Sequence, residues 1–78
     1  MKPREKAERG VTLLKEAILE ILAETDSGMG NSEIADALNI RSDYQGSNQD
    51  YLSWSILGLL LNEKKIDRSD RKYIIRDP

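Results

Sequence analysis

The stretch SNQDYLSWSILGLLLNEKKI, residues 47–66, holds the only tryptophan of the chain and its longest apolar run. That run covers residues 56–61, whereas a helix needs about 20 apolar residues to span a bilayer. The stretch is therefore not expected to enter a membrane. Because four polar residues open it, we expect a core helix, residues 47–64, whose front end projects beyond the protein.

Helical spacing of about 100° per residue divides this helix into two arcs. The wide apolar arc is expected to face the protein, with Trp54 in the core, and contains Leu52, Trp54, Ile56, Leu57, Leu59, Leu60 and Leu61. The other arc is expected to be exposed and contains Asn48, Gln49, Tyr51, Ser55, Gly58 and Asn62. Two alternatives stay open for Gly58, an exposed position or a close approach of another backbone. Ser47 and Asp50 have the spacing of a helix-capping pair.

Two helical patterns precede this stretch. Residues 11–23 repeat apolar side chains every three or four positions, which predicts an amphipathic helix that ends at the glycines of residues 27–30. Residues 31–40 predict a short helix capped by Asn31 or Ser32, with Glu33 in its first turn. Residues 1–10 are polar and form either a disordered lead-in or an extension of the first helix.

After the long helix the periodicity changes. Residues 66–68 and 72–75 predict two strands, and residues 69–71 predict the turn between them. A short segment around Met29 is expected to add a minor third strand. The predicted fold class is α+β, mostly α, with three helices followed by a β-hairpin in one domain, residues 11–76.

Composition excludes several kinds of chemistry. The chain has no cysteine and no histidine, so disulfides, thiolate metal sites and histidine-based catalysis are excluded. Glu16, Glu20 and Glu24 share one helical face, but no second helix offers matching ligands, so a solvated stripe is expected. We therefore expect no enzyme activity, no metal and no cofactor. The missing cysteines and the charged start, which lacks a signal-peptide core, favour a cytoplasmic location.

The motif order resembles a winged helix-turn-helix. Residues 31–40, NSEIADALNI, are similar to the first helix of a bacterial or archaeal helix-turn-helix pair. The end of the chain resembles the end of winged-helix regulators, through residues 59–68, LLLNEKKIDR, and residues 71–75, RKYII. It also resembles winged-helix modules that accompany restriction enzymes. One departure is the seven-residue segment 41–47, since a simple helix-turn-helix has a turn of about three or four residues. This departure leaves the docking angle of the third helix open.

The resemblance implies that the third helix enters the major groove of double-stranded DNA and that the hairpin wing, residues 66–75, contacts phosphate or the minor groove. Because such side chains bond base edges, the base-reading candidates are Asn48, Gln49, Tyr51 and Ser55. The phosphate candidates are Arg41, Tyr44, Ser47, Arg68, Arg71 and Lys72. Structural alternatives stay open for several of these: Arg41 suits the end of its helix, Tyr44 and Tyr51 suit local packing, and Asp67 and Asp70 are counter-charges in the wing. The expected role is transcription regulation or support of a DNA-processing system.

Charge is distributed unevenly. Residues 26–63 hold one cation against six carboxylates, and residues 64–78 hold six cations against three carboxylates. DNA affinity is therefore expected to come mainly from the wing and to fall steeply with salt. The acidic middle favours an alternative, a protein–protein interaction module without DNA binding. A homodimer formed through residues 1–24 is compatible with both alternatives.

Overall fold

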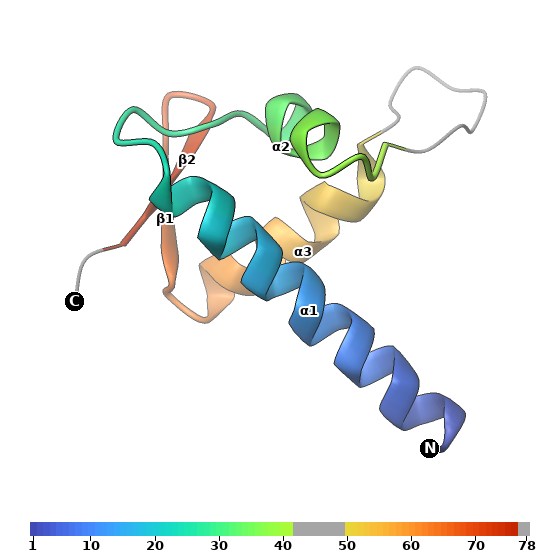
Figure 1. Ribbon diagram of the computed structural model, residues 1–78. Helices are drawn as coiled ribbons and strands as arrows, with labels where there is room; N and C mark the ends of the chain where they lie inside the picture. The colour runs from blue at the N-terminus through green and yellow to red at the C-terminus, as the bar shows by residue number, and fades with distance from the viewer. Residues whose placement is uncertain (42–49, 77–78) are drawn as a thin grey trace.

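The computed structural model describes residues 1–41 and 50–76. Within them the chain forms three helices and a hairpin (Figure 1): α1 Pro3–Ala23, α2 Asn31–Ala37, α3 Tyr51–Asn62, β1 Ile66–Ser69 and β2 Lys72–Ile75. This α+β, mostly helical order confirms the one predicted from the sequence. Four of the candidate site residues lie outside the described residues, namely Tyr44, Ser47, Asn48 and Gln49.

Helix α1 begins earlier than its apolar pattern indicates. It starts at Pro3, a residue whose fixed φ suits the first helical turn, and it includes most of the charged first ten residues. Those ten residues are all exposed, whereas Ile18 and Leu22 near the other end are fully buried. The N-terminal half of α1 therefore projects past the rest of the domain (Figure 1).

The hydrophobic core collects one face from each helix and one face of the hairpin. Its buried members are Ile18, Leu22, Ile34, Ala35, Ile56, Leu57, Leu60, Ile66 and Tyr73. The faces predicted for the first two helices are confirmed at Ile18, Leu22, Ile34 and Ala35. In α3 the buried apolar residues are Ile56, Leu57 and Leu60. They are one, three and four residues apart, so they lie on one side of the helix.

The hairpin is antiparallel, with Ile66 opposite Ile75 and Ser69 opposite Lys72. Strand β1 is thus one residue longer than predicted, and the turn contains only Asp70 and Arg71. Both turn residues have positive φ, 51° and 67°. Two positive values identify a type I′ turn, whose twist matches that of the strands it joins. Glycine or asparagine usually occupies such positions because other side chains are strained there.

Met29 ties the hairpin to the connection between α1 and α2. Its N–H donates to the Tyr73 carbonyl at 3.0 Å, and its carbonyl accepts from the Tyr73 N–H at 2.8 Å. The minor third strand predicted around Met29 is therefore confirmed as an isolated bridge on the free edge of β2. Gly28 makes this approach possible, since a Cβ there would lie 2.6 Å from Ile74 Cγ2 and 2.8 Å from the Tyr73 oxygen.

No helix in residues 1–41 and 50–76 is long and apolar enough to cross a membrane.

Two glycines provide a matched stability test. Gly28→Ala should lower the free energy of unfolding by about 1–3 kcal/mol, because φ is +84° and the new methyl group overlaps the hairpin. Gly58→Ala should raise it by up to about 1 kcal/mol, since Gly58 is inside a helix and nothing lies within 4 Å of an added Cβ. Urea unfolding of the two variants measures both effects. Equal destabilisation by the two changes would contradict the close contact at Gly28.

Candidate functional site

A partly buried polar junction joins the start of α2 to the start of α3. Asp50 is the N-cap residue of α3 and is only 7% exposed. Ser32 donates a hydrogen bond from Oγ to Asp50 Oδ2 at 2.6 Å, and the Asn31 amide donates to the Asp50 backbone oxygen at 3.2 Å. Because burying a carboxylate without partners is strongly unfavourable, these donors hold Asp50 in place. We call Asn31, Ser32, Arg41, Asp50 and Ser53 the polar junction.

Ser53 and Arg41 complete the junction from two sides. The Ser53 hydroxyl is fully buried and lies 2.5 Å from Asn31 Oδ1 and 3.1 Å from the Asp50 backbone oxygen. Arg41 places Nε 3.2 Å from Asp50 Oδ1 and Nη1 3.2 Å from Asp36 Oδ1. Arg41 and Asp50 flank residues 42–49 in the sequence, so this ion pair holds the two ends of that segment together.

The junction corrects the predicted caps of the second helix. Gly30 is the N-cap residue of α2, and its N–H donates to Glu33 Oε1 at 3.1 Å. Asn31 and Ser32 were expected to cap α2, but their side chains bond Asp50 and Ser53 instead. Asp50 was expected three residues inside the helix as the partner of Ser47, but it is itself the N-cap residue of α3, and its carboxylate faces α2 and makes no cap hydrogen bond. Tertiary partners thus outweigh local capping for all three side chains.

Ser53 is the residue that sequence reasoning missed. It shares a helical face with Ile56, Leu57 and Leu60, at offsets of three, four and seven residues. A serine on the buried side of an apolar helix needs a hydrogen-bond partner. The place of Ser53 among these apolar residues could therefore have predicted from the sequence that another polar element contacts the first turn of α3.

The opposite side of α3 is an exposed apolar surface. The exposed fractions are 57% for Tyr51, 44% for Leu52, 60% for Trp54 and 40% for Leu59, and Ser55 is also exposed. We call these five residues the outer face of α3. Tyr51 and Ser55, the two described base-reading candidates, both belong to it.

The predictions that Trp54, Leu52 and Leu59 face the protein are therefore wrong. Ser53 occupies the central inner position of the first turn, because the polar junction requires its hydroxyl there. Its neighbours Leu52 and Trp54 are each turned about 100° away from that direction. The buried arc of α3 is consequently narrow. Gly58 also has open space above it instead of the close backbone contact considered from the sequence.

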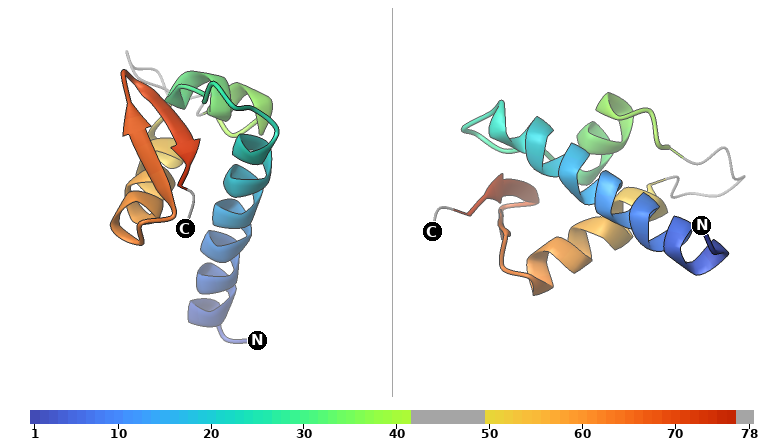
Figure 2. Two further views of the ribbon diagram at one scale, coloured as in Figure 1. Left: turned by 90° about the vertical axis from the view of Figure 1, so that its left-hand side faces the viewer. Right: turned by 60° about the horizontal axis from the view of Figure 1, so that its bottom comes forward.

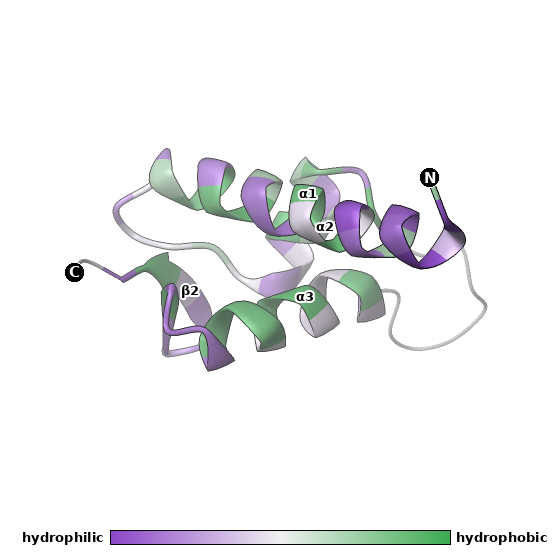
Figure 3. Ribbon diagram, turned by 90° about the horizontal axis from the view of Figure 1, so that it is seen from below, coloured by the Kyte–Doolittle hydropathy of each residue, from purple (hydrophilic) through white to green (hydrophobic). Residues whose placement is uncertain are grey.

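The outer face of α3 carries no charge. Residues 51–62 contain no lysine, arginine, aspartate or glutamate. The hydropathy colouring shows this contrast, since α3 is green or pale along its length while α1 alternates with purple (Figure 3). Monomeric proteins rarely expose large contiguous apolar surfaces, and such surfaces often mark binding sites.

The hairpin that follows α3 carries exposed positive charge. Arg68, Arg71 and Lys72 are all exposed, and the Arg68 guanidinium lies 5.6 Å from the centre of the Tyr73 ring, a cation–π distance. Figures 2 and 3 place the hairpin and α3 on the same side of α1. Asp67 is paired with Arg76 at 3.9 Å, which reduces its repulsion of an anion.

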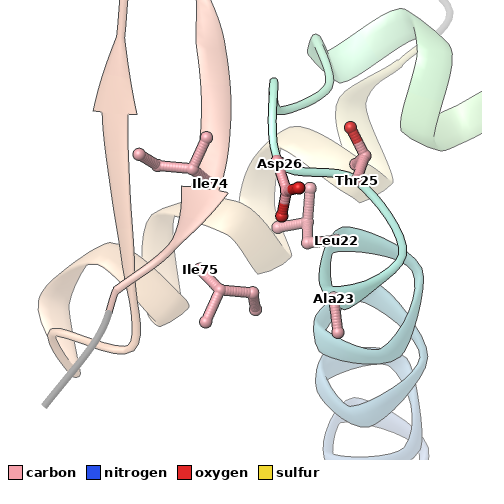
Figure 4. A pocket seen from close by; sticks show the side chains of 6 residues that line it. All are labelled: Leu22, Ala23, Thr25, Asp26, Ile74 and Ile75. Atoms are coloured by element: carbon pink, nitrogen blue, oxygen red, sulfur yellow. The ribbon is translucent and has the colours of Figure 1, made fainter.

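A pocket of about 350 Å³ opens between the end of α1 and β2 (Figure 4). Its lining is Leu22, Ala23, Thr25, Asp26, Ile74 and Ile75. Asp26 is its one ionisable side chain, so it offers no acid–base pair. Across residues 1–41 and 50–76, no three carboxylates gather closely enough to hold a metal ion.

No protein-family model, curated protein or solved structure matches this chain.

The junction predicts unequal roles for the two carboxylates that contact Arg41. Asp50→Ala should lower the free energy of unfolding by about 1–2 kcal/mol, because it removes the Ser32 hydrogen bond and the Arg41 ion pair of a mostly buried carboxylate, while the hydrogen bonds of Asn31 and Ser53 to the Asp50 backbone oxygen remain. Asp36→Ala, the matched control, should change it by less than about 1 kcal/mol, because that ion pair is exposed to water. Chemical denaturation monitored by circular dichroism measures both. Similar small effects would show that the junction does not stabilise the fold.

Proposed function

We propose that this chain is a DNA-binding module of the winged helix-turn-helix type. In this proposal α2 and α3 form the helix-turn-helix, the outer face of α3 enters the major groove, and the β1–β2 hairpin is the wing on phosphate or the minor groove. The module acts as a transcription regulator or as an accessory of a DNA-processing system. The order of elements and the shared side of α3 and the hairpin support it.

The observation that carries the proposal is the backbone of Arg71. Its φ of 67° lies in the left-handed region, where a residue other than glycine is disfavoured by about 1–2 kcal/mol. Glycine at this turn position would stabilise the hairpin. Asn39, Lys64 and Asp70 also have positive φ. An arginine kept in this region at the tip of a cationic hairpin supports the proposal that its side chain has a role in binding.

The neighbouring charges suit a polyanion. Arg68, Arg71 and Lys72 lie within five residues of one another at the end of the hairpin, and Arg68 is held against Tyr73. Asp50, the only formal charge at the front of α3, is buried and paired with Arg41, so it adds little repulsion toward phosphate. Arg41 is itself bound to two carboxylates, and we assign it a structural role instead of a phosphate contact.

Changes at the two turn residues test this proposal. Arg71→Gly should raise the free energy of unfolding by about 1 kcal/mol, because it relieves strain. The same change should weaken duplex binding by about tenfold at roughly 50 mM salt, because it removes a charged contact. Fluorescence anisotropy with labelled duplex pools measures affinity, and urea unfolding measures stability.

Asp70→Gly is the matched control, since it relieves the other positive φ without removing a cation. It should leave stability the same or higher and DNA affinity unchanged or stronger. If the unchanged chain binds no duplex at about 50 mM salt, where phosphate contacts are strong, the DNA-binding proposal fails.

A second candidate function is a protein-interaction module, and the exposed Trp54 favours it. Tryptophan and tyrosine side chains are enriched in the centres of protein interfaces, and the outer face of α3 exposes one of each. A second copy of the chain could occupy this face, because an uncharged surface does not repel itself. The acidic part of the chain also suits a basic partner protein.

Sedimentation equilibrium at micromolar concentration tests the pairing form of this candidate. A dimer that Trp54→Ala dissociates, together with absent DNA binding, would establish the second function for α3. A dimer that persists in Trp54→Ala would instead point to residues 1–24. A monomer that binds duplex DNA would leave the first proposal in place.

A further inference from the structure

The outer face of α3 presents few groups that can bond a polar base edge. Its polar atoms are the hydroxyls of Tyr51 and Ser55 and the indole N–H of Trp54, while Leu52 and Leu59 present only carbon. A donor or acceptor on a base that is buried against leucine loses its water without replacement, which is unfavourable. A surface of this kind therefore favours an apolar group at the same place in the groove.

The major groove of DNA displays one such group, the C5-methyl of thymine. We propose that the outer face of α3 recognises pyrimidine C5-methyl groups in the major groove, through Leu52 and Leu59. This inference rests on the proposed DNA-binding function and names what the same face would select. The exposed cations of the neighbouring hairpin favour a nucleic acid over an uncharged partner as the occupant.

The shape of the face permits this contact. Leu52 and Leu59 are seven residues apart, two helical turns, and lie on one flank, while Trp54 lies on the other. Between them are Tyr51, Ser55, Gly58 and Asn62, and an added Cβ at Gly58 would meet nothing within 4 Å. The face is low only where Ser55 and Gly58 lie, between Tyr51 at its front and Asn62 at its end, so a base edge that enters there meets the leucine flank beside it.

Two bases carry this methyl group, thymine and 5-methylcytosine, and both place it at the same atom of the ring. The groove contact is chemically the same for both. Duplexes of one sequence distinguish these sources when thymine is replaced by deoxyuridine in one arm and cytosine by 5-methylcytosine in another.

The experiment measures binding of the full chain to these duplexes by anisotropy at about 50 mM salt, where phosphate contacts are strong. A second readout is the emission of Trp54, the only tryptophan of the chain, which lies on the face concerned. Deoxyuridine duplexes should bind at least about fourfold more weakly, the equivalent of one buried methyl group. Duplexes with 5-methylcytosine should bind more tightly than unmodified ones if the added methyl groups lie where the leucines reach.

Variants separate recognition of the methyl group from general affinity. Leu52→Ala and Leu59→Ala should bring the affinities for thymine and deoxyuridine duplexes together, and both positions are exposed enough to keep the fold. Arg71→Gly should weaken binding to both duplexes equally and leave their ratio unchanged.

Equal binding of thymine and deoxyuridine duplexes by the unchanged chain would overturn this inference while leaving the DNA-binding function in place. Absence of binding to every duplex would overturn both. Selectivity for thymine that survives both leucine changes would show that another surface reads the methyl group, and would also overturn the inference.

Discussion

Asp50 links the two helices whose relative placement determines the rest of the surface. Its carboxylate accepts from Ser32 and pairs with Arg41, and its backbone oxygen accepts from Asn31 and lies within hydrogen-bond distance of Ser53. A buried carboxylate is tolerated only where such partners surround it, so these contacts specify one arrangement. That arrangement fixes α2 against α3 and also sets the rotation of α3 about its own axis.

The rotation of α3 explains the surface that results. Ser53 must face inward to reach Asn31, so Leu52 and Trp54 lie on the flanks. The hairpin is positioned separately, through the backbone pairing of Met29 with Tyr73 and the close approach at Gly28. Two independent constraints thus place α3 and the cationic hairpin on the same side of α1 (Figure 2). Neither feature alone suggests a ligand as specifically as the two together.

Predictions from the sequence were confirmed where the spacing of apolar residues alone determines which side of an element is buried. The apolar spacing around Ile18 and Ile34 predicted buried faces, and the change of period after Lys65 predicted the hairpin. Sequence reasoning failed at Trp54, because size and hydrophobicity favour burial on average but do not say which way a helix is rolled. It also failed at the caps. Asn31 and Ser32 are typical of a helix start, but their side chains bond Asp50 and Ser53, which are distant in the sequence.

The sequence by itself determined the order of three helices and a hairpin, the lack of charge across residues 51–62, and the cations near the end of the chain. These follow from composition and from periods of about 3.6 and 2 residues, which depend only on near neighbours. Only the tertiary structure decided which side of α3 is exposed and that Arg71 has a strained backbone. The exposed side of α3 depends on contacts between residues far apart in the chain, such as Ser32 with Asp50. The strain at Arg71 depends on the pairing of Ser69 with Lys72, which leaves two residues for the turn, and the period of the sequence did not fix that register.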